Sequence, residues 1–147
     1  RLDRWVVNPT ARTVSETVVN ELALEFPRCH PALVGKPYRW GYTVIADGSR
    51  FPGILKHDML AGTFERVDFG PGRQGAEPVF VPREGSVEED DGYLMTFVYD
   101  ESTRTSDFVV FDARDLQRGS IATVKLPARV PYGFHGSWIP DSQVGPV

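Results

Sequence analysis

The sequence predicts an all-β chain, and three observations support this fold class. Short runs rich in Val, Ile, Phe, Tyr and Thr alternate with Gly, Pro, Asp and Asn along the 147 residues. β-branched and aromatic residues favour strands, whereas the intervening residues favour turns. The 12 prolines and 14 glycines fit the same class, because both residues separate strands more often than they occupy helices. Only Glu21–Leu24 and Ala113–Gln117 show a helical pattern, and both are too short to form a stable helix alone.

Ten segments have the composition of strands. Each is bounded by turn residues, among them the pairs Asp47-Gly48, Ala61-Gly62, Asp91-Gly92 and Arg118-Gly119. The predicted strands, in chain order, are Leu2–Val7, Thr13–Val19, Arg39–Ala46, Phe51–His57, Thr63–Phe69, Ala76–Val81, Tyr93–Tyr99, Thr105–Asp112, Ile121–Leu126 and Phe134–Ile139.

A weak internal repeat favours a β-propeller. Glu25-Phe26-Pro27, Glu77-Pro78-Val79 and His135-Gly136 follow one another at spacings of 52 and 58 residues, with four strand-like runs between Glu77 and His135. Units of about 40–50 residues and four strands are typical of propeller blades. The first residues of each blade face the central axis, so the three polar side chains are predicted to converge there. A sandwich of ten strands fits the strand pattern almost equally well.

Composition excludes several classes of partner. The formal net charge is −4 and no basic cluster occurs, which argues against nucleic acid as a partner. No apolar run approaches the roughly 18 residues that span a bilayer. The single cysteine, Cys29, has no internal disulfide partner. A lone cysteine fits a reducing compartment, so we expect a cytoplasmic location.

One histidine lies in an unusual setting near the end of the chain. His135 stands between aromatic residues and glycines in the segment from Val130 to Pro140. Neutral histidine is the commonest nitrogen ligand of metals, and glycine leaves room for close approach. A lone histidine in a β protein is nevertheless more often hydrogen-bonded to a backbone carbonyl. Glu25 and Glu77 are, by themselves, expected to be exposed or paired with a cation.

Three other patterns point to no chemistry. Gly70–Gly75 matches G-x-G-x-x-G, but a strand with two prolines follows it instead of the helix that a dinucleotide site requires. Glu88–Gly92 lacks the ligand spacing of a calcium loop and is expected to be a solvated turn. Cys29 and His30 are adjacent on an extended chain, so they point to opposite faces and cannot form a nucleophile–base pair.

Taken together, the motifs resemble a known family. In order they read EFPR, EPVFVPR, EEDDG and PYGFHG, at Glu25–Arg28, Glu77–Arg83, Glu88–Gly92 and Pro131–Gly136. This order is similar to the C-terminal part of the carotenoid cleavage oxygenases, from about Trp5 to Pro140. The family includes carotenoid and lignostilbene dioxygenases and the retinal pigment epithelium isomerohydrolase. The chain departs from the family pattern at Cys29 and His30, where an aliphatic residue and Asp are more usual.

The resemblance implies a fold. Family members are seven-bladed β-propellers about three times longer than this chain, which also begins with Arg1 instead of Met. We therefore expect residues 1–140 to form the C-terminal two to three blades of such a propeller, and residues 141–147 to form a tail. The chain is then a fragment of a larger enzyme, with open strand edges that favour self-association.

The resemblance also implies a metal site. His135 corresponds to the last of four family histidines that bind Fe(II) on the propeller axis, and neither His30 nor His57 occupies a matching position. Glu25 and Glu77 correspond to glutamates that accept a hydrogen bond from the outer nitrogen of an iron-bound histidine. Whether either glutamate serves His135 stays open, and His135 without a carboxylate partner is one alternative. The family also has an apolar substrate tunnel, and Phe134 is a candidate for its wall.

The implied function is that of a non-haem Fe(II) dioxygenase. The full-length enzyme would use O₂ to cleave a conjugated double bond of a carotenoid, apocarotenoid or stilbene into two carbonyl products, while this fragment alone would be inactive. Peripheral membrane contact by the full-length enzyme is left open. Two alternatives remain: an isomerohydrolase of the same family, with iron as a Lewis acid, and a metal-free β domain that only binds a ligand.

Overall fold

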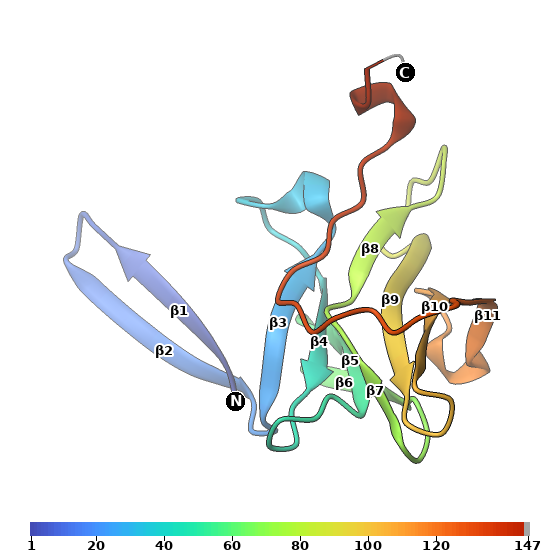
Figure 1. Ribbon diagram of the computed structural model, residues 1–147. Helices are drawn as coiled ribbons and strands as arrows, with labels where there is room; N and C mark the ends of the chain where they lie inside the picture. Colours follow the sequence, from blue (N-terminus) through green and yellow to red (C-terminus); the bar gives the residue numbers. More distant parts are fainter. Residues whose placement is uncertain (146–147) are drawn as a thin grey trace.

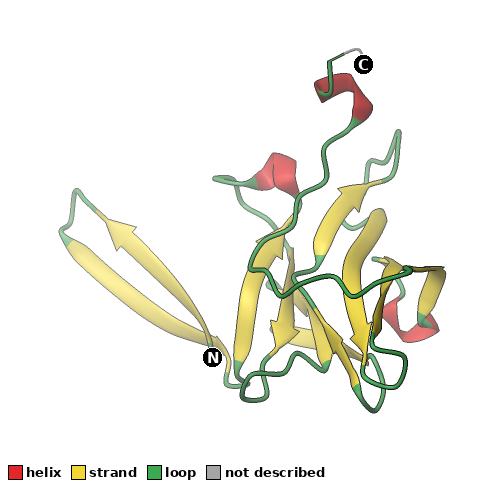
Figure 2. Cartoon of the chain, viewed as in Figure 1, coloured by secondary structure: helices red, strands yellow, loops and turns green. Residues whose placement is uncertain are grey.

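The computed structural model describes residues 1–145, and strands dominate it (Figures 1 and 2). Three short 3₁₀ helices interrupt the strands: η1 (Pro31–Leu33), η2 (Leu116–Arg118) and η3 (Asp141–Gln143). The strands are β1 (Leu2–Asn8), β2 (Thr13–Asn20), β3 (Leu24–Cys29), β4 (Trp40–Ile45), β5 (Gly53–Asp58), β6 (Thr63–Asp68), β7 (Arg73–Gly75), β8 (Val79–Pro82), β9 (Gly92–Asp100), β10 (Thr105–Asp112) and β11 (Ser120–Lys125). No helix among the described residues is long and apolar enough to cross a membrane.

The strands form three antiparallel sheets. The first is the β1–β2 hairpin, which extends away from the rest of the chain (Figure 1). The second has the order β3-β4-β5-β6, and the third has the order β11-β10-β9 with both β7 and β8 paired to β9. Successive strands are neighbours throughout the second sheet and from β8 to β11 in the third, where β7 and β8 both pair with β9. This up-and-down order is the one that propeller blades have, whereas a sandwich usually has Greek-key connections.

The two larger sheets share one apolar core. The ring of Tyr42 in β4 stacks on Phe80 in β8, with ring centroids 5.5 Å apart and planes inclined by 8°. Each fully buried Leu or Ile adds about 1.5–3 kcal/mol to stability, so this core is the main attraction between the sheets. Its buried members are Tyr42, Val44, Ile54, Phe80, Leu94, Val98, Val109, Phe111, Ala113 and Leu116.

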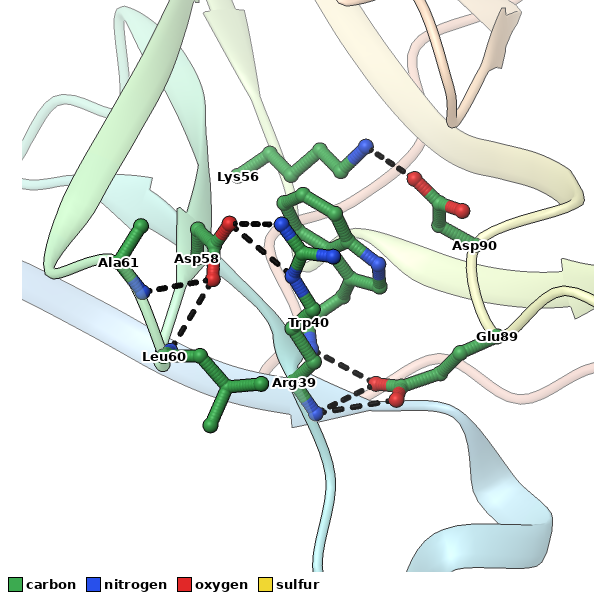
Figure 3. A network of polar contacts seen from close by, with 8 residues as sticks. All are labelled: Arg39, Trp40, Lys56, Asp58, Leu60, Ala61, Glu89 and Asp90. Carbon is green, nitrogen blue, oxygen red and sulfur yellow. Dashed lines mark hydrogen bonds and ion pairs between the residues drawn. The ribbon is translucent and has the colours of Figure 1, made fainter.

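A polar network joins the same two sheets beside the core (Figure 3). Glu89 accepts hydrogen bonds from the backbone N–H groups of Arg39 (2.9 Å) and Trp40 (2.7 Å). Asp90 pairs with the buried Lys56 at 2.6 Å, and the Lys56 ammonium lies 3.9 Å from the centroid of the Trp40 ring. Glu88–Gly92 is a turn, as expected, but it is not simply solvated, because the side chains of Glu89 and Asp90 bind the neighbouring sheet.

Nine of the ten predicted strands coincide with observed ones, and the tenth is wrong. Phe134–Ile139 contains no strand. The chain after β11 runs past β9 and then between β3 and β8 (Figure 1). Its Gly136 N–H bonds to a side chain instead of a neighbouring strand. The helical pattern at Glu21–Leu24 is also wrong, because β3 begins at Leu24. Two observed strands, β3 and β7, are absent from the predicted ones. The residues of β7 fall in a glycine-rich segment that favours a loop.

Candidate functional site

A β-bulge in β3 orients the first motif. Glu25 pairs with Val44 and Arg28 pairs with Tyr42, so three steps along β3 oppose two steps along β4. Phe26, inside the bulge, has a φ of 52°, in the left-handed region that costs an L-residue about 1–2 kcal/mol. Paired residues of antiparallel strands point to the same face. Arg28 therefore shares the face of Tyr42, which points toward β8; without the bulge it would point the opposite way.

A second irregularity orients Glu77. Gly75 pairs with Val98 and Val79 pairs with Met95, so the chain between β7 and β8 has one residue more than the facing part of β9. The hydroxyl of Thr96 replaces the missing ladder contacts, because it accepts from the Ala76 N–H at 3.2 Å and donates to the Ala76 carbonyl at 2.9 Å. The side chain of Glu77 is left only 3% exposed.

Glu77 and His135 are in direct contact. His135 Nδ1 lies 3.1 Å from Glu77 Oε1, and the Gly136 N–H donates to Glu77 Oε2 at 2.8 Å. Arg28 donates from Nε to Oε1 and from Nη2 to Oε2, both at 2.7 Å. Each carboxylate oxygen thus accepts two hydrogen bonds, which uses about all the lone pairs that it has. Of the two candidate glutamates, Glu77 is therefore the one that contacts His135.

The hydrogen bonds fix the charge of the carboxylate. Burial by itself raises the pKa of Glu77, but the hydrogen bonds from Arg28, Gly136 and His135 outweigh it and hold the pKa below its usual value. An ionised carboxylate can only accept, so His135 Nδ1 carries the proton. In the neutral imidazole, the other ring nitrogen, Nε2, then has a free lone pair on the side of the ring away from Glu77. That lone pair is the group that could bind a metal.

An apolar cavity adjoins this histidine. It has a volume of about 320 Å³ and is lined by Glu77, His135, Met95, Phe97, Phe134 and Trp138, among others. Phe134 lies in the wall as the tunnel hypothesis requires, and its role in binding substrate stays a prediction. The ring of Phe26 meets His135 edge-on, with centroids 5.8 Å apart at 78°. The imidazole therefore lies between a buried carboxylate and aromatic surface, while its side chain is 72% exposed.

The remaining candidates lie outside this cluster. Glu25 is exposed in β3, and Arg28 of the same motif makes the contact with Glu77. His57 is buried against Thr43 Oγ1 at 2.9 Å, and burial lowers its pKa to about 4. His30 caps η1 by accepting from the Ala32 N–H. Sequence reasoning assigned no role to Arg28; the signal was its position in the same motif as Glu25.

The up-and-down strand order of the two larger sheets is that of β-propeller blades, and the contact between Glu77 and His135 lies at their junction. The model of the retinal pigment epithelial membrane protein family matches residues 1–140, so the chain belongs to this family. The predicted all-β propeller fold is confirmed, since the related structures are seven-bladed propellers of which this chain corresponds to a part.

Named relatives are carotenoid-cleaving enzymes. The chain is 40% identical over 142 residues to the apocarotenoid-15,15'-oxygenase of Synechocystis, covering 94% of this chain and 29% of that protein. It is 42% identical over 136 residues to a chloroplastic 9-cis-epoxycarotenoid dioxygenase of Arabidopsis thaliana, covering 92% and 23%. The crystal structure of cobalt-substituted Synechocystis apocarotenoid oxygenase matches with a TM-score of 0.88 at 39% identity, covering 93% and 29%. The chain thus spans less than a third of these relatives.

Proposed function

We propose that the complete protein carrying this chain is a non-haem Fe(II) dioxygenase that cleaves a conjugated double bond of a carotenoid, apocarotenoid or stilbene-type substrate. The observation that carries the proposal is the contact of 3.1 Å between His135 Nδ1 and the buried Glu77. A carboxylate on the outer nitrogen is the usual arrangement around a metal-bound histidine. The named relatives are carotenoid and apocarotenoid oxygenases, and one was solved in a cobalt-substituted form.

The residues present fit one ligand of a ferrous ion, not a complete site. Neutral imidazole is a suitable Fe(II) ligand through its free nitrogen. Residues 1–145 contain no group of three or more His, Cys, Asp or Glu side chains that could hold a metal ion. The other ligands would therefore come from outside this chain. We accordingly expect the 147-residue chain alone to be inactive.

Each residue of the site has a defined part in this proposal. Iron, when bound, supplies the dioxygen chemistry that splits the double bond into two carbonyl products. Glu77 keeps the proton on His135 Nδ1, orients the ring and makes Nε2 a stronger donor. The apolar wall with Met95, Phe97 and Phe134 would exclude water and receive the hydrocarbon chain of the substrate.

The test uses the full-length protein with His135→Ala and the matched control His30→Ala. His135→Ala should remove bound iron and activity, whereas His30→Ala, which changes a histidine outside the Glu77 cluster, should retain both. Metal content is measured by mass spectrometry and activity by the loss of polyene absorbance. A His135→Ala protein with stoichiometric iron would contradict the assignment.

Two alternatives predict different results in the same samples. A dioxygenase transfers oxygen from ¹⁸O₂ into the carbonyl products, whereas an isomerohydrolase uses iron as a Lewis acid and yields no cleaved product. A metal-free binding domain would contain no iron in the wild-type protein. Product analysis under ¹⁸O₂ together with the metal content therefore separates the three functions.

A further inference from the structure

Arg28 connects three segments that are distant in the sequence. It belongs to β3, it binds both oxygens of Glu77 between β7 and β8, and its Nη2 also donates to the Gly136 carbonyl at 3.0 Å. The carboxylate that it binds is 3% exposed, while its own side chain is 40% exposed. Bidentate arginine–carboxylate pairs fix geometry as well as charge, because the two parallel hydrogen bonds allow one relative orientation.

The backbone beside His135 depends on this pair. Both backbone polar groups of Gly136 are hydrogen-bonded: its N–H donates to Glu77 at 2.8 Å and its carbonyl accepts from Arg28 at 3.0 Å. The segment Phe134–Ile139 has no strand ladder that could hold it in place. Upstream, the backbone is held at Val130, whose N–H donates to Ser106 Oγ at 3.0 Å. Arg28 and Glu77 thus replace the missing ladder at the position of the candidate ligand.

We propose that Arg28 is a positioning residue for His135, which clamps Glu77 and Gly136 so that the imidazole presents Nε2 in one fixed orientation. This inference rests on the proposed function where it concerns metal binding, and on the structure alone where it concerns the clamp. Arg28 touches neither the metal nor the substrate. It acts through Glu77 and through the backbone that follows His135.

Lysine cannot replace arginine in this clamp. Its ammonium is a single point charge, so it cannot donate in parallel to both oxygens of Glu77 and also reach the Gly136 carbonyl in the same geometry. Arg28→Lys should therefore keep the charge balance of the buried carboxylate but loosen the orientation. Arg28→Met removes the charge and the hydrogen bonds while it retains most of the side-chain volume. The two variants separate the charge of Arg28 from its geometry.

The experiment uses the full-length protein with Arg28→Met, Arg28→Lys and the matched control Arg66→Met. Arg66 is a surface arginine on β6, and the hydrogen bonds of its guanidinium go to Asp68 on the same strand. Two quantities are measured: the dissociation constant for Co²⁺ added to the metal-free protein, and the hydrogen exchange of the Gly136 amide. The Trp40 amide, which donates to Glu89 in the second contact between the sheets, is the internal standard.

Arg28→Met should weaken Co²⁺ binding about 10–100-fold, the usual effect of removing an outer partner of a metal ligand. It should also raise the exchange rate of the Gly136 amide at least about 10-fold while that of Trp40 stays unchanged. Arg28→Lys should give an intermediate effect, and Arg66→Met none. Equal acceleration at Gly136 and Trp40 would indicate general destabilisation and overturn the proposal, as would unchanged exchange at Gly136. A wild-type protein without Co²⁺ affinity would overturn the proposed function, and the exchange rates would still decide the clamp.

Discussion

Replacement of Glu77 by Gln tests the site most directly, because it changes one atom and little volume. In the native structure four donors converge on the carboxylate: two from Arg28, one from His135 and one from Gly136. An amide offers one accepting oxygen and one NH₂ group that only donates. Whichever way the amide is turned, its NH₂ group faces two donors. Two of the four hydrogen bonds are therefore lost as long as His135 keeps its proton on Nδ1.

The cost follows from these contacts. A hydrogen bond to a charged group adds about 1.5–3 kcal/mol, so the loss of two costs at least about 3 kcal/mol. The lower end applies, since the Arg28 side chain is 40% exposed and its unpaired charge stays hydrated. If the NH₂ group faces His135, then Nδ1 must accept and Nε2 must carry the proton, which removes the lone pair for a metal. A decrease in metal affinity of about 10–100-fold is expected.

The assay compares Glu77→Gln with Glu101→Gln in the full-length protein. Glu101 is a surface carboxylate paired with Arg50, with side chains 40% and 57% exposed, so its replacement should change stability by less than about 1 kcal/mol. Metal affinity is measured by titration of the metal-free protein and stability by denaturant unfolding. Wild-type affinity and wild-type turnover in Glu77→Gln would refute the role of Glu77 as the orienting partner of His135.

Three further predictions follow from other parts of the chain. Burial lowers the pKa of His57 from 6.5 to about 4, so the stability that the neutral ring contributes is full above pH 6.5 and is lost as pH falls toward 4. His57→Gln should therefore reduce the change of the urea unfolding midpoint with pH across this window, and an unchanged pH dependence would contradict this cause. Lys56→Met should cost about 2–4 kcal/mol by leaving Asp90 unpaired, and the double change with Asp90→Asn should recover most of this loss in thermal unfolding. The 147-residue chain alone should bind iron weakly and self-associate through open strand edges and exposed apolar residues such as Trp5, which is 65% exposed; sedimentation that shows a monomer at all concentrations would contradict this.

Strand patterns in the sequence predict the positions of most strands, because strand formation depends mainly on the chemistry of side chains close together in the sequence. β-branched and aromatic runs with turn residues between them define β9 and β10 almost to the residue. The same signal fails at Phe134–Ile139, since an apolar run does not show whether a partner strand is available. There the backbone N–H of Gly136 bonds to Glu77, a contact between residues 59 positions apart that no local pattern contains.

The sequence predicts the candidate site only in part, because some of its contacts depend on how two strands pair. The recurrence of an acidic residue near a proline pointed to Glu77 and to the region of Glu25, but not to the role of Arg28. That role depends on the register of β3 against β4, where a single extra residue decides which side chains face β8. Register is a property of the strand pair, so the sequence of β3 alone does not contain it.

Proline gives a physical reason for the repeat itself. Pro27 lies in the bulge of β3 and Pro78 lies in the irregular stretch between β7 and β8. A proline donates no backbone hydrogen bond, so a ladder can be interrupted at that position without leaving a buried N–H unpaired. The interruption turns the neighbouring charged side chains, Arg28 in one motif and Glu77 in the other, toward each other. The two motifs resemble one another because strand pairing is interrupted at each of them. One interruption places Arg28 and the other places Glu77, and these two side chains form the ion pair beside His135.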